Sequence, residues 1–265
     1  MFITVITDCS CPNAYGRQST RISALFGITP TFVGTSSDLD SPSHIEASGH
    51  IIDMLDAADG TDGIILSNVA PRGTKGRWEN GTPFGYFDYE GTRVISTVDG
   101  EVLSLAKKFG LIPKVNLFDI PTVMNHLAQS GIVSSERAES VIHTQFRSFN
   151  FLPRVAHWLY NNIEIPTTEY NLSEIPEIEP VIWYHDNFGN YKTTLLKEDL
   201  NIVDGRVETK FGSLPFHEKL TNVPNGQAAL TIGSSGLGDK RFVELVVQKG
   251  RATDHFKAKI GDYIL

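Results

Sequence analysis

The stretch that most constrains the fold is the apolar run at the start of the chain. The residues from Phe2 to Thr7 are β-branched or aromatic, and no charge interrupts them. Such a run is typical of a buried strand in a parallel sheet. Asp8 follows at the carboxyl end of this strand, where open α/β sheets bind ligands and where a carboxylate can accept both hydroxyls of a ribose. The residues alone leave open a plainer role for Asp8, as the cap of the next helix or turn.

Further apolar runs alternate with helical patterns over the first 165 residues. Ser43 and Glu46 form a capping-box pattern at the start of one such helix. The alternation predicts an α/β fold with a layered, mainly parallel sheet. We expect strands over residues 31–35, 63–69 and 93–98, and helices over residues 18–26, 43–58, 102–109, 121–130, 134–147 and 153–160.

The pattern changes after a proline-containing, acidic stretch without periodicity, which predicts a linker over residues 166–180. Short apolar runs follow, and their spacing is typical of a small antiparallel barrel or sandwich. We therefore expect an N-terminal α/β domain over 1–165 and a C-terminal β-barrel-like domain over 181–265. The expected C-terminal strands are residues 181–184, 191–195, 227–232 and 242–247.

The composition narrows the class of partner. The formal net charge is −8, and no cluster of five basic residues occurs, which argues against nucleic acid or an anionic membrane as partner. No apolar run is long enough to span a bilayer, so we expect a cytoplasmic protein. Cys9 and Cys11 are the only cysteines, and their spacing suits neither a disulfide nor, without further ligands nearby, a metal site.

Five segments, in order along the chain, carry a resemblance to a known family. The most specific is Asp186-Asn-Phe-Gly-Asn190, which follows the predicted linker. Together the segments resemble the S-adenosylmethionine (SAM) hydroxide adenosyltransferase family, whose superfamily includes the SAM-dependent fluorinase and chlorinase. The five segments are residues 2–22, with Thr7, Asp8, Asn13, Tyr15 and Gln18; 65–74, with Arg77; 94–104, with Asp99; 183–194; and 232–236, with 242–263.

The resemblance implies SAM as a bound substrate, no separate cofactor, and a homotrimer with each site between two subunits. SAM has an adenine ring, a ribose diol, a sulfonium cation and a methionine zwitterion. A site for it therefore needs an aromatic ring, an acceptor for the diol, carboxylates and hydrogen-bond donors. By resemblance, Arg77 lies at the reacting centre. The implied substrate-binding residues are Asp8 for the ribose, Phe188 and Asn190 for adenine, Asn13 and Asp186 for the methionine ammonium, Ser234 and Ser235 for its carboxylate, and also Tyr15 and Asp99.

Plainer interpretations of two of these segments remain open. The segment from Phe188 to Asn190 also fits a hairpin turn with a buried ring. Ser234 and Ser235 also fit a simple polar loop. His185, next to Asp186, is more typical of a neighbour of a site than of a catalyst.

Departures from the family pattern fall on the nucleophile site. Ala70 stands where hydroxide-transferring relatives have an Asp, and Phe146 stands where they have a His. The halide-binding Tyr and Thr of the halogenases are absent as well, so a halogenase is not expected. Two functions stay open: hydrolysis of SAM to adenosine and methionine, and non-catalytic binding of SAM or adenosine.

Overall fold

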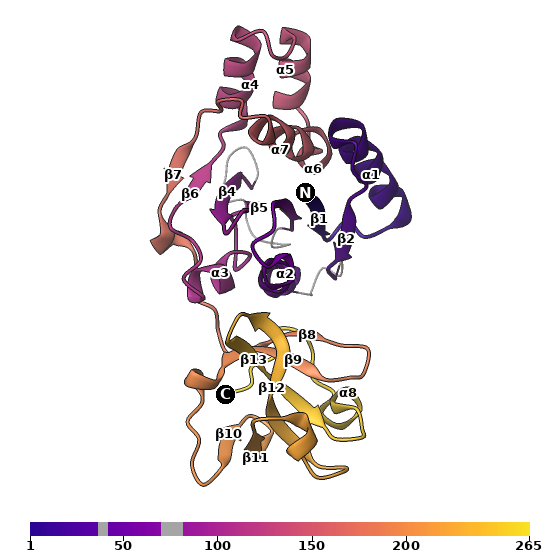
Figure 1. The fold of residues 1–265 in the computed structure, drawn as a ribbon, viewed down its shortest axis with the longest axis vertical. Helices are drawn as coiled ribbons and strands as arrows, with labels where there is room; N and C mark the ends of the chain where they lie inside the picture. Colours follow the sequence, from indigo (N-terminus) through magenta and orange to yellow (C-terminus); the bar gives the residue numbers. More distant parts are fainter. Residues whose placement is uncertain (37–41, 70–81) are drawn as a thin grey trace.

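A computed structural model describes residues 1–36, 42–69 and 82–265, so Ala70 and Arg77 lie outside the described residues. The N-terminal half is built on a sheet with helices on both faces, and a second sheet forms the C-terminal domain (Figure 1). This arrangement confirms the predicted fold class of an α/β domain followed by a mostly antiparallel β domain.

The described part of the N-terminal domain holds a seven-stranded sheet in the order β2-β1-β3-β5-β4-β6-β7. The four strands β2, β1, β3 and β5 are parallel, and the remaining pairs are antiparallel. Thr7 pairs with both Gly34 and Asn68, so β1, β2 and β3 end at the same edge. The strands are β1 (Phe2–Thr7), β2 (Thr31–Gly34), β3 (Gly63–Asn68), β4 (Phe84–Tyr89), β5 (Thr92–Thr97), β6 (Val115–Leu117) and β7 (Thr168–Tyr170).

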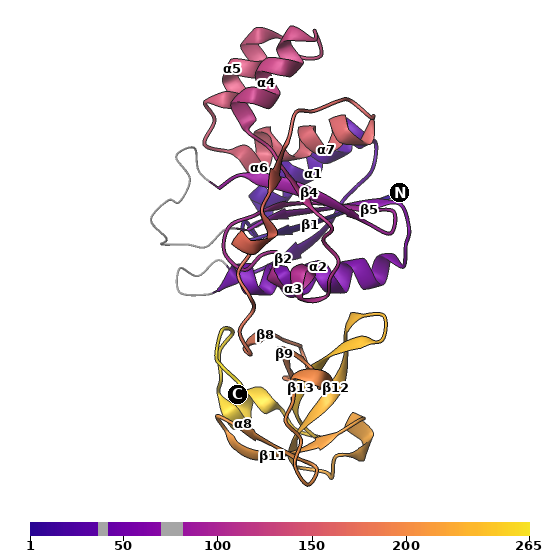
Figure 2. The same cartoon turned by 90° about the vertical axis from the view of Figure 1, so that its left-hand side faces the viewer.

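Helices cover both faces of this sheet (Figure 2). Helices α2 and α3 bury one face, where Ile6, Ile65 and Val94 meet them in a common core. Helices α1, α4, α5 and α7 bury the other face against Val5 and Leu66. The helices are α1 (Pro12–Phe26), α2 (Ser43–Ala58), α3 (Ser104–Lys108), α4 (Ile120–Gln129), α5 (Ser135–Ile142), α6 (Arg147–Asn150) and α7 (Leu152–Tyr160).

The described C-terminal domain holds a six-stranded sheet in the order β10-β11-β12-β13-β9-β8. Its pairs are antiparallel except for β11 with β12. The elements are β8 (Ile182–His185), β9 (Tyr191–Leu196), β10 (Arg206–Thr209), β11 (Gly212–His217), β12 (Ala228–Leu237), β13 (Lys240–Val247) and α8 (Ala252–Phe256).

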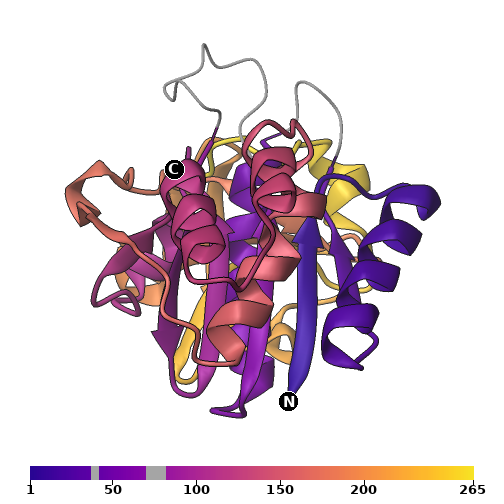
Figure 3. The ribbon, with the colours of Figure 1, turned by 90° about the horizontal axis from the view of Figure 1, so that it is seen from above.

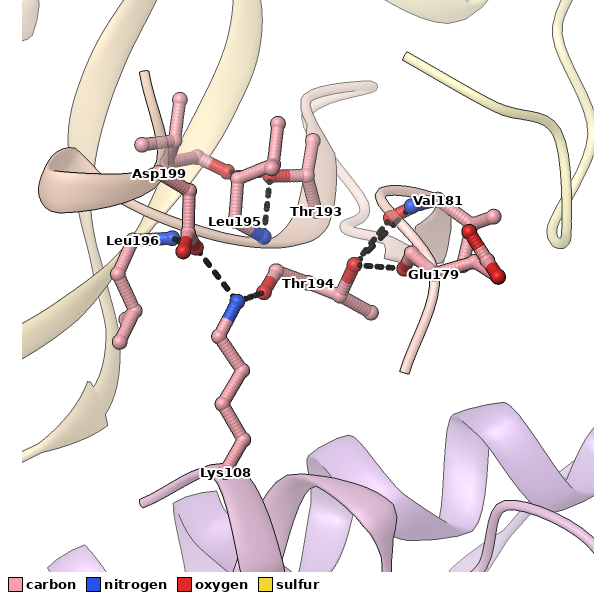
Figure 4. Close-up of polar contacts among 9 residues, drawn as sticks. Lys108, Glu179, Val181, Thr193, Thr194, Leu195, Leu196 and Asp199 are labelled. Carbon is pink, nitrogen blue, oxygen red and sulfur yellow. Dashed lines mark hydrogen bonds and ion pairs between the residues drawn. The ribbon is translucent and has the colours of Figure 1, made fainter. Parts of the chain in front are cut away.

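The two domains meet along α2 and α3. The ring of Trp183 covers Gly49, where a Cβ atom would lie only 2.2 Å from the indole carbon Cε3. On α3, Lys108 donates to the carbonyl of Thr194 at 2.9 Å and to Asp199 Oδ2 at 2.5 Å (Figure 4). The C-terminal domain is therefore docked on the α2–α3 layer through both apolar and charged contacts.

Several local expectations need correction. The capping box at Ser43 and Glu46 is wrong: the N-cap residue of α2 is Pro42, whose side chain makes no capping hydrogen bond. The Glu46 carboxylate instead accepts from the backbone N–H of Ser36 at 3.2 Å, which ties α2 to the end of β2. Strands β4, β6, β10 and β11 were not expected. The residues expected to form the linker contain β7, which extends the N-terminal sheet.

Candidate functional site

The carboxylate of Asp8 lies where the sequence places it, directly after β1 at the carboxyl edge of the parallel strands. In Figure 3, β1 runs from the N-terminus to this edge. The backbone on both sides of Asp8 is anchored: Cys9 N donates to Thr7 Oγ1 at 3.1 Å, and Thr35 N donates to the carbonyl of Thr7 at 3.0 Å. Asp8 is only 7% exposed. The Asp8 side chain is thus buried, on an anchored stretch of backbone, at the edge where sheets of this class bind ligands.

Helix α1 begins four residues after Asp8, with Pro12 in its first turn. The ring of Tyr15 stacks on Phe32 at 4.6 Å between centroids, and burial raises the pKa of its hydroxyl. A Cβ atom at Gly34 would lie 2.4 Å from that hydroxyl oxygen, so a larger residue at position 34 would displace the Tyr15 side chain. Tyr15 therefore joins α1 to β2, whereas Asn13 is exposed on the first turn of the same helix.

Asp99 follows β5 near the same sheet edge. Its Oδ1 accepts from the N–H of Gly100 at 3.1 Å, and Oδ2 accepts from the Thr82 hydroxyl at 3.5 Å. These bonds fix the carboxylate in a half-buried position. Asp8, Tyr15 and Asp99 thus lie near the carboxyl edge of the N-terminal sheet, where the sequence places Asp8.

The tip of the β8–β9 hairpin is organised by the carboxylate of Asp186. Its Oδ1 accepts from the backbone N–H groups of Phe188 and Asn190, both at 2.9 Å, and Oδ2 accepts from the Asn190 side-chain amide at 3.1 Å. Gly189 has φ +84°, and a Cβ atom there would lie 2.7 Å from Thr253 Oγ1. The ring of Phe188 is 69% exposed, so the alternative of a hairpin with a buried ring is wrong. The turn holds an aromatic face toward solvent.

Ser234 and Ser235 lie near the end of β12, against the far half of α2. The hydroxyl of Ser235 donates to both carboxylate oxygens of Asp53, at 2.5 Å to Oδ2, and Gly236 N donates to Asp53 Oδ1 at 3.0 Å. Ser234 is exposed, and its carbonyl accepts from Arg241 at 3.0 Å. Ser235 therefore fastens the C-terminal domain to α2.

The predicted residues fall into three separate groups within one chain. The hydrogen bond from Ser36 N to Glu46 shows that the first turn of α2 lies beside the sheet edge that carries Asp8. Asp53 is seven residues further along the helix, about 10 Å away. Figure 2 places the β12–β13 hairpin and α8 at opposite sides of the C-terminal domain. Ser235, on the β12–β13 side, is therefore separate within one chain from both Asp8 and the β8–β9 hairpin tip.

Two buried hydroxyls at the same edge were missed by sequence reasoning. Thr35 Oγ1, after β2, and Ser67 Oγ, near the end of β3, have no hydrogen-bond partner among the described residues. Ser67 pairs in register with Ser96 of β5, so hydroxyl groups replace the apolar side chains as these strands end. That change from apolar to hydroxyl residues is the signal that could have identified them.

Metal and membrane sites find no support in the described structure. Among residues 1–36, 42–69 and 82–265, no three His, Cys, Asp or Glu side chains gather in a way that could hold a metal ion. Within the same ranges, no helix is both long enough and apolar enough to cross a membrane. Cys9 and Cys11 are both exposed and form no disulfide.

Comparisons with known proteins agree with this architecture. Residues 181–265 match the family model of the SAM hydroxide adenosyltransferase C-terminal domain. The C-terminal domain of the chain therefore belongs to that family, which confirms the resemblance for this part of the sequence. No curated protein matches the sequence.

Solved structures extend the likeness in fold to the whole chain. The crystal structure of an uncharacterized conserved protein from Thermotoga maritima is similar at TM-score 0.66 and 13% identity, with 100% of both chains covered. A conserved hypothetical protein from Thermus thermophilus is similar at TM-score 0.59 and 16% identity, with 100% of this chain and 99% of that chain covered. At such identities the likeness establishes the two-domain fold alone.

Proposed function

We propose that the protein binds SAM and catalyses the attack of water on its ribose C5′ carbon, giving adenosine and methionine. The observation that carries the proposal is the buried carboxylate of Asp8 at the carboxyl edge of the sheet, in a chain whose C-terminal domain belongs to the SAM hydroxide adenosyltransferase family. A buried carboxylate that accepts both ribose hydroxyls would orient the sugar and its C5′ carbon.

The adenine would be held by the β8–β9 hairpin tip. The exposed ring of Phe188 offers a stacking face, and the Asn190 side chain can pair with an adenine edge through donor and acceptor groups. Asp186 already accepts three hydrogen bonds within the turn. Its first role is therefore to hold this turn. The carboxylate still has lone pairs to accept a hydrogen bond from the methionine ammonium, which Asn13 would also bind.

A complete site would need two copies of the chain. The hairpin tip bonds within its own domain: Thr253 N donates to the carbonyl of Gly189 at 3.0 Å, and Arg251 donates to the carbonyl of Asn187 at 3.0 Å. No ring contact to Phe188 occurs within the described residues. We therefore propose that Phe188 of one copy meets Asp8 of another, in the homotrimer that the resemblance implies.

The reaction is a substitution at carbon. The water oxygen forms a bond to C5′, the C5′–sulfur bond breaks, and the sulfur leaves with the electron pair as the neutral thioether of methionine. The proton lost by the water passes to solvent. The His of the family pattern has no counterpart here, because Phe146 carries no proton-accepting group and is 64% exposed. The hydroxyls of Thr35 and Ser67 are candidates to orient the attacking water.

Turnover with isotopic labelling tests the proposal. The protein is incubated with SAM in H₂¹⁸O, and adenosine and methionine are separated by chromatography. We expect the ¹⁸O atom in the 5′-hydroxyl of adenosine, and a large loss of rate in Asp8→Asn. Product formation without ¹⁸O in adenosine would contradict the proposed nucleophile.

The second candidate is a non-catalytic SAM or adenosine binding protein. The observation that favours it is Phe146, which replaces the family His at an exposed position. Calorimetry with SAM and with adenosine separates the two functions: binding without turnover supports this second candidate. Absence of binding by either ligand would refute both.

A further inference from the structure

Four arginines gather on the outer face of the N-terminal domain, where α1 packs against α6 and α7. Figure 1 shows these three helices next to one another. Arg17 and Arg21 are one helical turn apart on α1, so they present both guanidinium groups on one face. Their Cζ atoms lie 4.4 Å and 4.3 Å from the centroid of the Phe149 ring on α6. Arg137 of α5 and Arg154 of α7 extend the same charged surface, which we call the arginine groove.

The described residues do not neutralise these four cations. Among the described residues, none of the four guanidinium groups makes an ion pair with a carboxylate. Their side chains donate instead to backbone carbonyls: Arg154 to Asn150 at 2.7 Å, and Arg21 to Phe149 at 3.5 Å. Burial and mutual repulsion lower the pKa of Arg21, and lower that of Arg154 to about 10. A chain of net charge −8 thus gathers unneutralised positive charge at one place.

The arginine groove also has room for a ligand. One hollow of about 430 Å³ is lined by Asn13, Arg17, Arg21 and Phe149, among others. A second hollow of about 330 Å³ is lined by Arg137 and Arg154, among others. The electrostatic coupling of Arg21 to both Arg137 and Arg154 indicates that the two hollows are neighbours. Volumes of this size suit a small molecule.

We propose that the arginine groove binds a small ligand that carries at least two linked phosphate groups. Planar guanidinium groups donate in pairs to phosphate oxygens, and several of them can share one polyphosphate. A single carboxylate would neutralise one of four cations, whereas a diphosphate neutralises two or three. Inorganic pyrophosphate and the diphosphate of a nucleotide share this chemistry.

The arginine groove is separate from the proposed reaction. Arg17 and Arg21 lie one and two turns beyond Asn13 along α1, away from Asp8. Only Asn13 belongs both to the hollow and to the proposed substrate-binding residues. Binding in the groove therefore does not require turnover of SAM, and the two proposals can fail independently.

Titration calorimetry with sodium pyrophosphate and with ADP, at low and at high salt, tests the proposal. We expect binding that weakens as salt rises, because charged contacts are screened. Arg17→Gln and Arg21→Gln should each weaken binding at least tenfold, and Arg21→Lys should fall between Arg21→Gln and wild type. Arg206→Gln, an exposed arginine on β10 of the other domain, is the matched control and should bind as wild type does.

Each arm of the experiment has a definite meaning. Tighter binding of ADP than of pyrophosphate supports a nucleotide as the source of the diphosphate, and equal binding supports an inorganic source. Circular dichroism melts confirm that each variant is folded. The proposal is overturned if neither ligand binds, or if the Arg17 and Arg21 variants bind unchanged. It is also overturned if these variants instead abolish self-association in sedimentation, because the groove would then be an interface between copies.

Discussion

Replacement of Asp8 by alanine provides the sharpest test of the candidate site. The Asp8 residue is 7% exposed, and hydrogen bonds anchor the backbone on both sides of it, so the side chain is held at the sheet edge. Each hydrogen bond to a charged group contributes about 1.5–3 kcal/mol, and Asp8→Ala removes two of them. The expected loss of at least about 3 kcal/mol corresponds to a loss of about a hundredfold or more in affinity for adenosine and for SAM.

Isothermal titration calorimetry on folded protein measures this effect. Free methionine, which lacks a ribose, should bind to Asp8→Ala as to wild type. Asp62→Ala is the matched control, because Asp62 is an exposed carboxylate at the opposite, amino end of the neighbouring strand β3. Unchanged adenosine affinity in a folded Asp8→Ala protein would refute the reasoning, since Asp8 would then be only a structural cap.

Two further predictions concern the contact between the domains. Gly49→Ala should lower the free energy of unfolding, measured by urea titration, by about 1–3 kcal/mol, because its Cβ would lie 2.2 Å from Trp183. Gly16→Ala is the control. Nothing lies within 4 Å of its Cβ, so this change within helix α1 should raise the free energy of unfolding by about 0.5–1 kcal/mol. Burial raises the pKa of Glu244 from 4.5 to about 7, so the folded state keeps a proton that the unfolded state has lost. This contribution is fully present below pH 4.5 and is lost as pH rises through 7, with a size of at most about 3 kcal/mol. The free energy of unfolding of wild type minus that of Glu244→Gln should therefore fall as pH rises from 4.5 to 7. Taking this difference cancels the opposite slope that His50 gives to both proteins, because burial lowers its pKa to about 4. An identical pH profile in wild type and Glu244→Gln would show that Glu244 does not titrate in this range.

Three of the parallel strands were predictable because they are short runs rich in β-branched or other apolar residues and are largely buried. β1, β3 and β5 were expected within a residue or two of their observed bounds. Strand β4 was missed because its sequence, Phe84-Gly-Tyr-Phe-Asp-Tyr89, mixes aromatic and polar residues. Its antiparallel pairing with β5 depends on tertiary structure and not on a local pattern. Strands β10 and β11 were missed for the same reason: their residues are largely polar or exposed.

The candidate site was only partly predictable. The position of Asp8 follows from strand periodicity alone, and the turn at Asp186 follows from its Asx and glycine residues. The contact of Ser235 with Asp53 depends on how two domains dock, which no local pattern specifies. The arginine groove was not predicted for a related reason. Arg17, Arg137 and Arg154 are far apart in the sequence and come together only when the helices pack.

Helix α2 has a consequence for how the protein unfolds. Its buried side chains share one core with the N-terminal sheet and with Trp183, Leu196 and Phe242 of the C-terminal domain. A boundary drawn at residue 181 therefore cuts through a continuous apolar core and does not separate two independent folding units. The chain should melt in a single cooperative calorimetric transition, and residues 181–265 expressed alone should expose these three large side chains and aggregate.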